Sequence, residues 1–171
     1  MAKQKEATLK VEKTSVREMS AEDRAKEVAK LQEEVDARNR EMETKLYIVE
    51  GGSETGEKLL KFVTEEAQWK FTEAIGVVEM TKEIEDAVAN AKGGKQLFLR
   101  VLPLEALWFF INKVEGVGLE KARYYAANLL KPIGDALARV KADRDAINEL
   151  MMRQGSLEVG ADFEEEVKSE K

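Results

Sequence analysis

The sequence predicts an all-α protein, an elongated helical bundle of two or three long helices with coiled-coil-like pairing around a short, apolar central hairpin. Three observations lead to this expectation. Ala, Glu, Lys, Leu and Val dominate the composition, and only two prolines occur in 171 residues, which favours helix. Apolar residues recur at steps of three and four over long stretches, the period of a helix with one buried face. Glycine-rich segments separate these stretches.

The first long helix is expected over residues 20–50. Ser20 can cap its N-terminus, and Glu22 and Asp23 fall in the first turn, where the helix dipole favours acidic side chains. Arg38 and Asn39 interrupt an apolar stripe, and the other faces are charged, so we expect this helix to be covered on one side only. The stripe consists of Ala21, Ala25, Val28, Leu31, Val35, Met42, Leu46 and Val49.

The segment Gly51–Lys58, GGSETGEK, has the glycine spacing of a phosphate-binding P-loop. Its lysine stands one place too late for that motif, and Glu57 would bring negative charge to the phosphate position. We therefore expect only a loop between two helices over residues 51–56.

A second long helix is expected over residues 57–92. Gly76 lies inside it, at a cost of about 1 kcal/mol relative to Ala, so we expect this glycine to allow another backbone to approach closely. The apolar stripe of this helix is broad enough to contact more than one neighbour. It consists of Leu60, Val63, Ala67, Phe71, Ala74, Val78, Ile84, Val88 and Ala91, and Trp69, Ile75 and Val77 widen it.

Residues 97–111, LFLRVLPLEALWFFI, form the most apolar stretch of the chain. Pro103 divides it into a short piece near 95–102 and a helix that begins at the proline. Trp108, Phe109 and Phe110 are consecutive, so they would point around most of that helix. This pattern predicts either a core helix or a surface that binds a protein partner. No stretch of 18 uncharged apolar residues occurs, so no membrane span is expected.

Residues 111–125, INKVEGVGLEKARYY, come next. Val114, Gly116, Val117, Gly118 and Ala122 give this segment the pattern by which it resembles the helix-hairpin-helix motif of non-sequence-specific DNA-binding proteins. The resemblance implies that the turn and the following helix N-terminus hold a phosphate. Glu115 replaces the proline that is usual in the motif. The implied phosphate or nucleic-acid contacts are Gly116, Val117, Gly118, Lys121 and Arg123.

The last long helix is expected over residues 119–154. Pro132 should kink it, and Gly155 should end it. Its stripe is Ala126, Leu130, Ile133, Leu137, Val140, Ile147 and Met151, with Arg144 as the one break. We expect residues 28–49 and 126–151 to pair within the chain, with pairing to other chains as the alternative. Acidic neighbours such as Glu34 or Asp145 would then balance Arg38 and Arg144.

The predicted domain organisation is an N-terminal arm at 1–19, a helical domain at 20–154 and an acidic C-terminal tail at 155–171. Both termini are charged, and we expect them to be flexible. The arm carries five basic and three acidic residues over positions 1–20, whereas the tail carries six acidic and two basic residues. The first ten residues lack the apolar segment of a secretory signal. We expect the chain in the cytoplasm or within a macromolecular assembly.

The composition argues against most enzyme chemistry. The chain has no cysteine, which excludes disulfides, thiolate nucleophiles and iron–sulfur clusters, and no histidine, the commonest general base. Glu105 is the one acid in an apolar setting, and its place in the first turn of a helix accounts for it. No catalytic residue, metal site or cofactor is predicted.

The expected function is that of a non-enzymatic structural or assembly protein that acts through helix-mediated protein–protein contacts. It would bind a protein partner or further copies of itself, and a subunit of a larger particle, such as a virus, fits this design. The first alternative is a non-sequence-specific nucleic-acid-binding protein that uses the glycine turn. The second is a small helical inhibitor or adaptor that presents Trp108, Phe109 and Phe110 to one partner.

Overall fold

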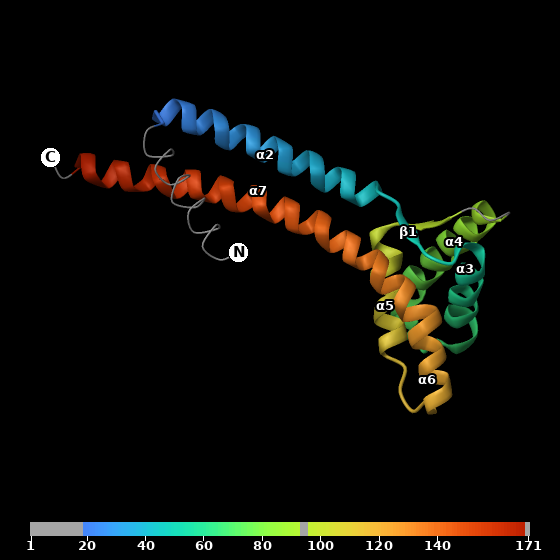
Figure 1. The fold of residues 1–171 in the computed structure, drawn as a ribbon. Coiled ribbons are helices and arrows are strands. Elements are labelled where there is room, and N and C mark those ends of the chain that lie inside the picture. The colour runs from blue at the N-terminus through green and yellow to red at the C-terminus, as the bar shows by residue number, and fades with distance from the viewer. Residues whose placement is uncertain (1–18, 93–95, 170–171) are drawn as a thin grey trace. The chain divides into compact units, whose positions relative to one another are not determined.

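The computed structural model describes residues 19–92 and 96–169, with side chains up to Glu158. Apart from its last residue, the predicted arm at 1–19 lies outside the described residues. The chain forms two compact units, residues 41–143 and residues 1–40 together with 144–171. Helices α2 (Ala21–Thr44) and α7 (Lys131–Ser169) contribute to both units (Figure 1). The all-α class is confirmed, with one short two-stranded sheet in addition.

In the unit that contains both ends of the chain, parts of α2 and α7 lie side by side (Figure 1). The backbone N–H of Asp23 donates to Ser20 Oγ at 3.1 Å, which confirms the predicted N-cap. The Gln154 amide donates to Gln32 Oε1 at 2.9 Å and links the two helices. Both helices bury apolar side chains here, namely Leu31, Val35, Ile147, Leu150 and Leu157. Coiled-coil pairing stays a prediction.

Two predictions about charge and helix ends have different outcomes in this unit. Arg38 forms an ion pair with Glu34 at 3.1 Å, so Glu34 does balance it as expected. The expected helix end at Gly155 is wrong, because α7 continues through this glycine to Ser169. One glycine weakens a helix by about 1 kcal/mol, and helix-forming neighbours on both sides outweigh that cost. The predicted tail at 155–171 is therefore mostly a continuation of α7.

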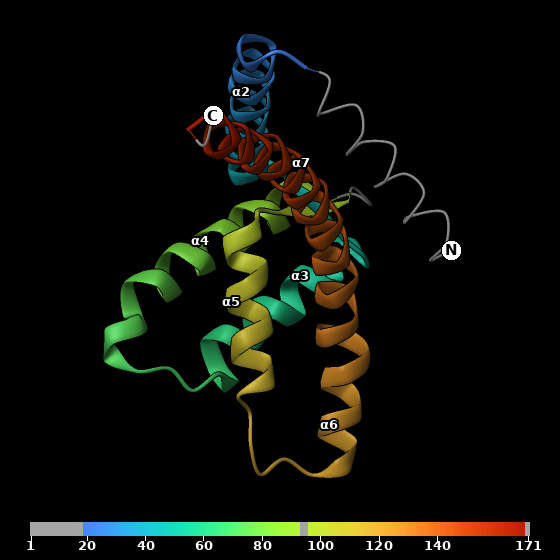
Figure 2. The same ribbon diagram turned by 90° about the vertical axis from the view of Figure 1, so that its left-hand side faces the viewer.

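The unit formed by residues 41–143 holds the large core. Figure 2 shows α5 flanked by α4 on one side and by α6 on the other. Its elements run in the order β1 (Tyr47–Val49), α3 (Gly52–Lys61), a π-helical turn (Phe62–Glu66), a 3-10 turn (Phe71–Glu73), α4 (Ala74–Ala91), β2 (Leu97–Leu99), α5 (Val101–Asn112), α6 (Leu119–Tyr125), a π-helical segment (Ala126–Leu130) and the start of α7.

The strands β1 and β2 correct the first predicted helix. That helix ends at Thr44 rather than near residue 50, and β1 pairs antiparallel with β2 in the register Tyr47↔Leu99. Tyr, Ile and Val in β1 favour a pleated strand, and pairing with β2 decides the structure of this short apolar run. Leu97 and Leu99 point inward and are fully buried, whereas Phe98 between them points outward and is exposed.

The predicted second helix is also wrong as one continuous element. The chain leaves helical geometry at Ala67, which is extended (φ −70°, ψ 135°), and turns again only from Phe71. Because of this break, the apolar residues after it that face the core are not the ones that one continuous helix would turn inward. The core side of α4 is formed by Val77, Met80, Ile84, Val88 and Ala91, while Phe71 and Val78 of the predicted stripe are exposed.

A π-helical turn lies directly before Pro132, the residue at which a kink is expected. The N–H of Lys131 bonds to the carbonyl of Ala126, five residues back, which gives the π-helical turn. Proline has no N–H and its ring crowds the preceding turn, so a wider turn accommodates it. The helical path from α6 into α7 therefore continues through Pro132.

Candidate functional site

The glycine turn joins α5 to α6, as the sequence predicts. Gly116 has a φ of +69°, which favours glycine, and Gly118 is extended (φ −65°, ψ 158°) as the residue before α6. Val117 lies between them and packs against the edge of the core. The backbone of the turn is thus defined, and what it can bind depends on the charges around it.

Lys121 forms an ion pair with an acidic side chain of the same unit. Its Nζ lies 2.8 Å from Glu66 Oε2, and the Tyr125 hydroxyl donates to the same carboxylate. The hydrogen bond to Glu66 raises the pKa of Lys121 to about 12, and the pKa of Glu66 falls below its ordinary value because of Lys121 and then Tyr125. A phosphate at the turn would have to compete with Glu66 for this lysine.

Lys113, on the other side of the turn, also faces a carboxylate. Its Nζ lies 3.6 Å from Glu73 Oε1 and 5.4 Å from the centre of the Phe109 ring. The pKa of Glu73 is lowered chiefly by the Lys70 backbone N–H, which donates to it at 2.6 Å. The last implied contact, Arg123, is exposed on α6. Of the implied basic contacts, Arg123 is thus the one that the structure does not pair with a carboxylate among the described residues.

The consecutive aromatics of α5 differ in exposure. Phe110 is 8% exposed and belongs to the core, whereas Trp108 is 40% and Phe109 is 55% exposed. A Cβ added at Gly134 would lie 3.3 Å from the Trp108 indole, so this tryptophan packs close to α7. The inward face of α5 is formed by Val101, Pro103, Leu104, Leu107 and Ile111. The three residues therefore do not form one continuous surface.

A different apolar surface lies at the start of α4. Phe71, in the 3-10 turn that leads into α4, is 92% exposed, and Ile75 and Val78 of α4 are 78% and 66% exposed. Their spacing of four and three residues places them on one side of this turn and helix. We call these residues the α4 stripe. Gly76 follows Ile75 in the chain but points to the side of the stripe, and no described atom outside its own helix lies within 4 Å of an added Cβ. The sequence did offer a signal, because this region has more apolar residues than one buried face can hold.

The P-loop-like segment forms a strand-to-helix turn instead of the expected helix–helix loop. Gly51 has a φ of +92°, and α3 already begins at Gly52. Lys58 Nζ lies 2.7 Å from Glu54 and 3.0 Å from the Asn128 amide oxygen. Gly56 lets α3 pack against α4, since an added Cβ would lie 2.4 Å from Val88. These glycines therefore serve the turn and the core.

No protein-family model matches this chain, and neither a curated protein nor a solved structure is significantly similar to it. In the described part of the chain, no group of three acidic side chains lies close enough to hold a metal ion. None of the described helices is long and apolar enough to cross a membrane. The surfaces of the chain itself are thus the basis for a functional proposal.

Proposed function

We propose that this chain is a non-enzymatic structural or assembly protein that acts through helix-mediated contacts, and that the α4 stripe contacts the same stripe of a second copy. Three large apolar side chains on one face of a helix are costly to leave in water, at roughly 25 cal/mol per Å². The fold of residues 41–143 does not bury them. A protein contact would bury them and account for their presence.

The exposure of Phe71, Ile75 and Val78 is the observation that carries this proposal. Gly76 lies beside the α4 stripe and not within it, because at about 100° per residue its Cβ position points roughly 100° away from the Ile75 side chain. Apart from its chain neighbours and the backbone of its own helix, no described atom comes within 4 Å of a Cβ added at Gly76. The proposed contact therefore rests on the three apolar side chains.

A second copy is the partner that the stripe itself fits best. In a two-fold contact the same patch meets itself, so Ile75 of one copy would face Val78 of the other. With α4 and its copy antiparallel, Lys82 would lie near the Phe71 ring of the other copy. A cation over an aromatic face is favourable, so the one basic side chain on this face would also be satisfied.

The experiment compares two substitutions of exposed apolar side chains by size-exclusion chromatography with light scattering over a range of concentrations. Ile75→Lys places a charge in the middle of the α4 stripe and should weaken self-association. Met152→Lys is the matched control, because Met152 is also a helical residue, is 65% exposed and lies outside the stripe.

The expected result is a dimer for the wild-type chain and for Met152→Lys, and a monomer at the same concentration for Ile75→Lys. A wild-type chain that stays monomeric at all concentrations would overturn the second-copy proposal. Equal association of the two variants would overturn the role of the α4 stripe. Thermal melts of both variants, run in parallel, separate changes in association from changes in folding.

The nucleic-acid alternative has weaker support. Gly116 and Gly118 have suitable backbone conformations, but Lys113 and Lys121 face Glu73 and Glu66. A fluorescence anisotropy titration with duplex and single-stranded DNA at low and moderate salt tests it, since binding through phosphates must weaken as salt rises. The adaptor alternative would rest on Trp108 and Phe109 alone, because Phe110 lies in the core.

A further inference from the structure

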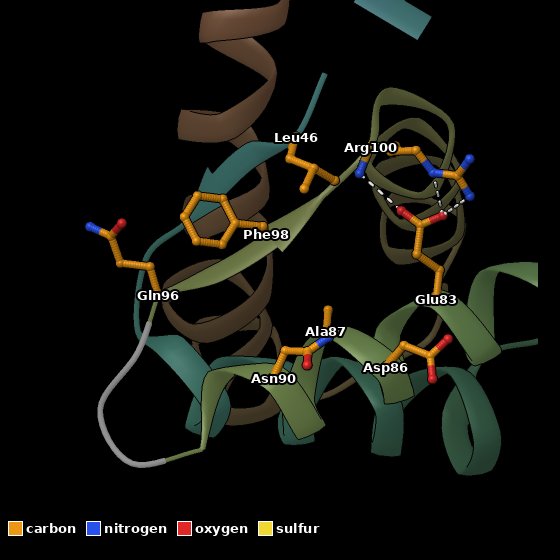
Figure 3. Close-up of a pocket in the computed structure, with 8 residues that line it drawn as sticks. All are labelled: Leu46, Glu83, Asp86, Ala87, Asn90, Gln96, Phe98 and Arg100. Carbon is orange, nitrogen blue, oxygen red and sulfur yellow. Dashed lines mark hydrogen bonds and ion pairs between the residues drawn. The ribbon is translucent and has the colours of Figure 1, made fainter. Parts of the chain in front are cut away.

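A groove of about 390 Å³ lies between β2 and α4 in the unit formed by residues 41–143. Figure 3 shows Leu46 and Phe98 above the groove and Asp86, Ala87 and Asn90 of α4 below it. Leu46 and Phe98 are 55% and 39% exposed, so they present apolar surface to whatever enters. This groove is separate from both the glycine turn and the α4 stripe.

The outer edge of β1 is closed by an arginine. Arg139 donates from a guanidinium N–H to the carbonyl oxygen of Ile48 at 2.6 Å. This carbonyl therefore points away from β2. In an antiparallel pair, the N–H and C=O of one residue point to the same side, so Ile48 does not exchange backbone hydrogen bonds with Phe98, the residue opposite it.

The same geometry fixes the direction of the β2 backbone. Because Phe98 is opposite Ile48 in a non-hydrogen-bonded pair, the N–H and C=O of Phe98 also point away from the sheet. Arg100 supports this assignment independently. Two residues further along β2, its N–H points the same way and donates to Glu83 Oε1 at 2.9 Å. The Phe98 backbone has no hydrogen-bond partner among residues 19–92 and 96–169.

The two carboxylates that line the groove, Glu83 and Asp86, differ in whether a basic side chain pairs with them. The Arg100 guanidinium pairs with Glu83 on α4 and leaves that carboxylate little capacity for a ligand (Figure 3). Asp86, one turn further along α4, is exposed and forms no ion pair with any described residue. The groove therefore offers one available carboxylate, exposed apolar side chains and a free strand edge.

We propose that this groove binds an extended peptide segment of another protein that carries a basic side chain. The peptide adds a strand to β2, donating to and accepting from the Phe98 backbone, which is a common way to recognise extended peptides. Its alternate side chains contact Leu46 and Phe98, and its lysine or arginine reaches Asp86. Helix-mediated association does not require this site, so the two proposals are independent.

The groove's chemistry favours this occupant over a helix or an acidic peptide. A helix satisfies its own N–H and C=O groups and gains nothing from a strand edge. An acidic side chain would face Asp86 and be repelled. An unpaired edge is also a site that proteins usually cover, as Arg139 covers β1 here.

The test uses a dye-labelled heptapeptide of alternating valine and lysine and the full-length chain. Binding is measured by fluorescence anisotropy at low salt, and the site is located from amide chemical shifts in ¹⁵N-labelled protein. The expected result is saturable binding with the largest shifts at residues 86–90 and 96–100. The same peptide with a methylated central backbone nitrogen, or with glutamate for lysine, should bind at least about tenfold more weakly.

Two protein variants complete the test. Asp86→Asn should weaken binding of the lysine peptide, whereas Glu85→Gln, which removes the same charge from the neighbouring exposed position outside the groove, should leave it within about twofold. Equal weakening by both variants, equal binding of the N-methylated peptide, or the absence of shifts at 96–100 would each overturn the proposal. A normal ¹⁵N spectrum of Asp86→Asn verifies that the variant folds.

Discussion

Helices α5 and α4 use apolar residues in opposite ways. The α5 helix lies in the most apolar stretch of the chain. Most residues of that stretch are buried in the core, and Leu104 and Leu107 are fully buried. The region around the start of α4 is less apolar in sequence, yet the 3-10 turn that leads into α4 carries Phe71, the most exposed large apolar side chain of the described residues. The apolar content of a segment therefore predicts that it packs against another surface. The position of each residue around the helix then decides whether it faces the core of its own unit or the solvent.

The different burial of apolar residues on α5 and α4 is tested most strongly by truncating one apolar residue on each helix. Leu104→Ala removes a fully buried side chain and should lower the free energy of unfolding by about 2–5 kcal/mol. Val78→Ala on the α4 stripe should change it by less than about 0.5 kcal/mol in the monomer. Urea denaturation of both variants measures the difference, and similar losses would contradict the assigned burial.

Two glycines compare the buried and the exposed surface of α4, since Gly56 of α3 contacts the buried side and Gly76 of α4 is exposed. Gly56→Ala brings a Cβ to 2.4 Å from a Val88 methyl on the core side of α4, so it should destabilise the chain by about 1–3 kcal/mol. Gly76→Ala on the exposed side should stabilise it. Chemical denaturation at low protein concentration gives both signs, and a stabilised Gly56→Ala would show that α3 and α4 pack less closely.

The smallest effect concerns the Glu66–Lys121–Tyr125 cluster beside α5. Because the pKa of Glu66 is lowered from 4.5, its contribution to stability is present above pH 4.5 and is lost as the pH falls through the lowered value. Because the pKa of Lys121 is raised from 10.5 to about 12, its contribution is present below pH 10.5 and is lost as the pH rises towards 12.

Glu66→Gln should flatten both limbs of the stability profile, which urea midpoints across the pH range would show. Glu65→Gln is the control, since Glu65 lies 4.0 Å from Lys61 in an exposed pair of little energetic value. Unchanged limbs in Glu66→Gln would mean that Lys121 has no close carboxylate partner in solution.

The helical class, the cap at Ser20, the ion pair of Arg38 with Glu34 and the glycine turn at 116–118 could all be predicted from sequence. Each depends on neighbours within a few residues, where local rules are strong. The strands do not follow from local rules, because Tyr47–Val49 becomes a strand only when it pairs with Leu97–Leu99, about fifty residues away.

The α4 stripe and the groove were missed for related reasons. The periodicity of residues 57–92 continues across the break at Ala67, so the pattern alone assigns Phe71 and Val78 to the core side. The groove depends on which way the Phe98 backbone points, and that follows from strand register rather than from residue type. Of the residues predicted to bind a partner, Phe110 lies in the core because its place on α5 faces inward.

Hydroxyl-radical footprinting with mass spectrometry, carried out over a range of protein concentrations, tests the contrast between α5 and α4 most directly. Phe71 should be oxidised readily in the dilute chain and become protected as the concentration rises, while Phe110 should stay protected throughout. Oxidation of Phe71 that does not change with concentration would contradict the contact through the α4 stripe. Ready oxidation of Phe110 in the dilute chain would contradict the burial of α5.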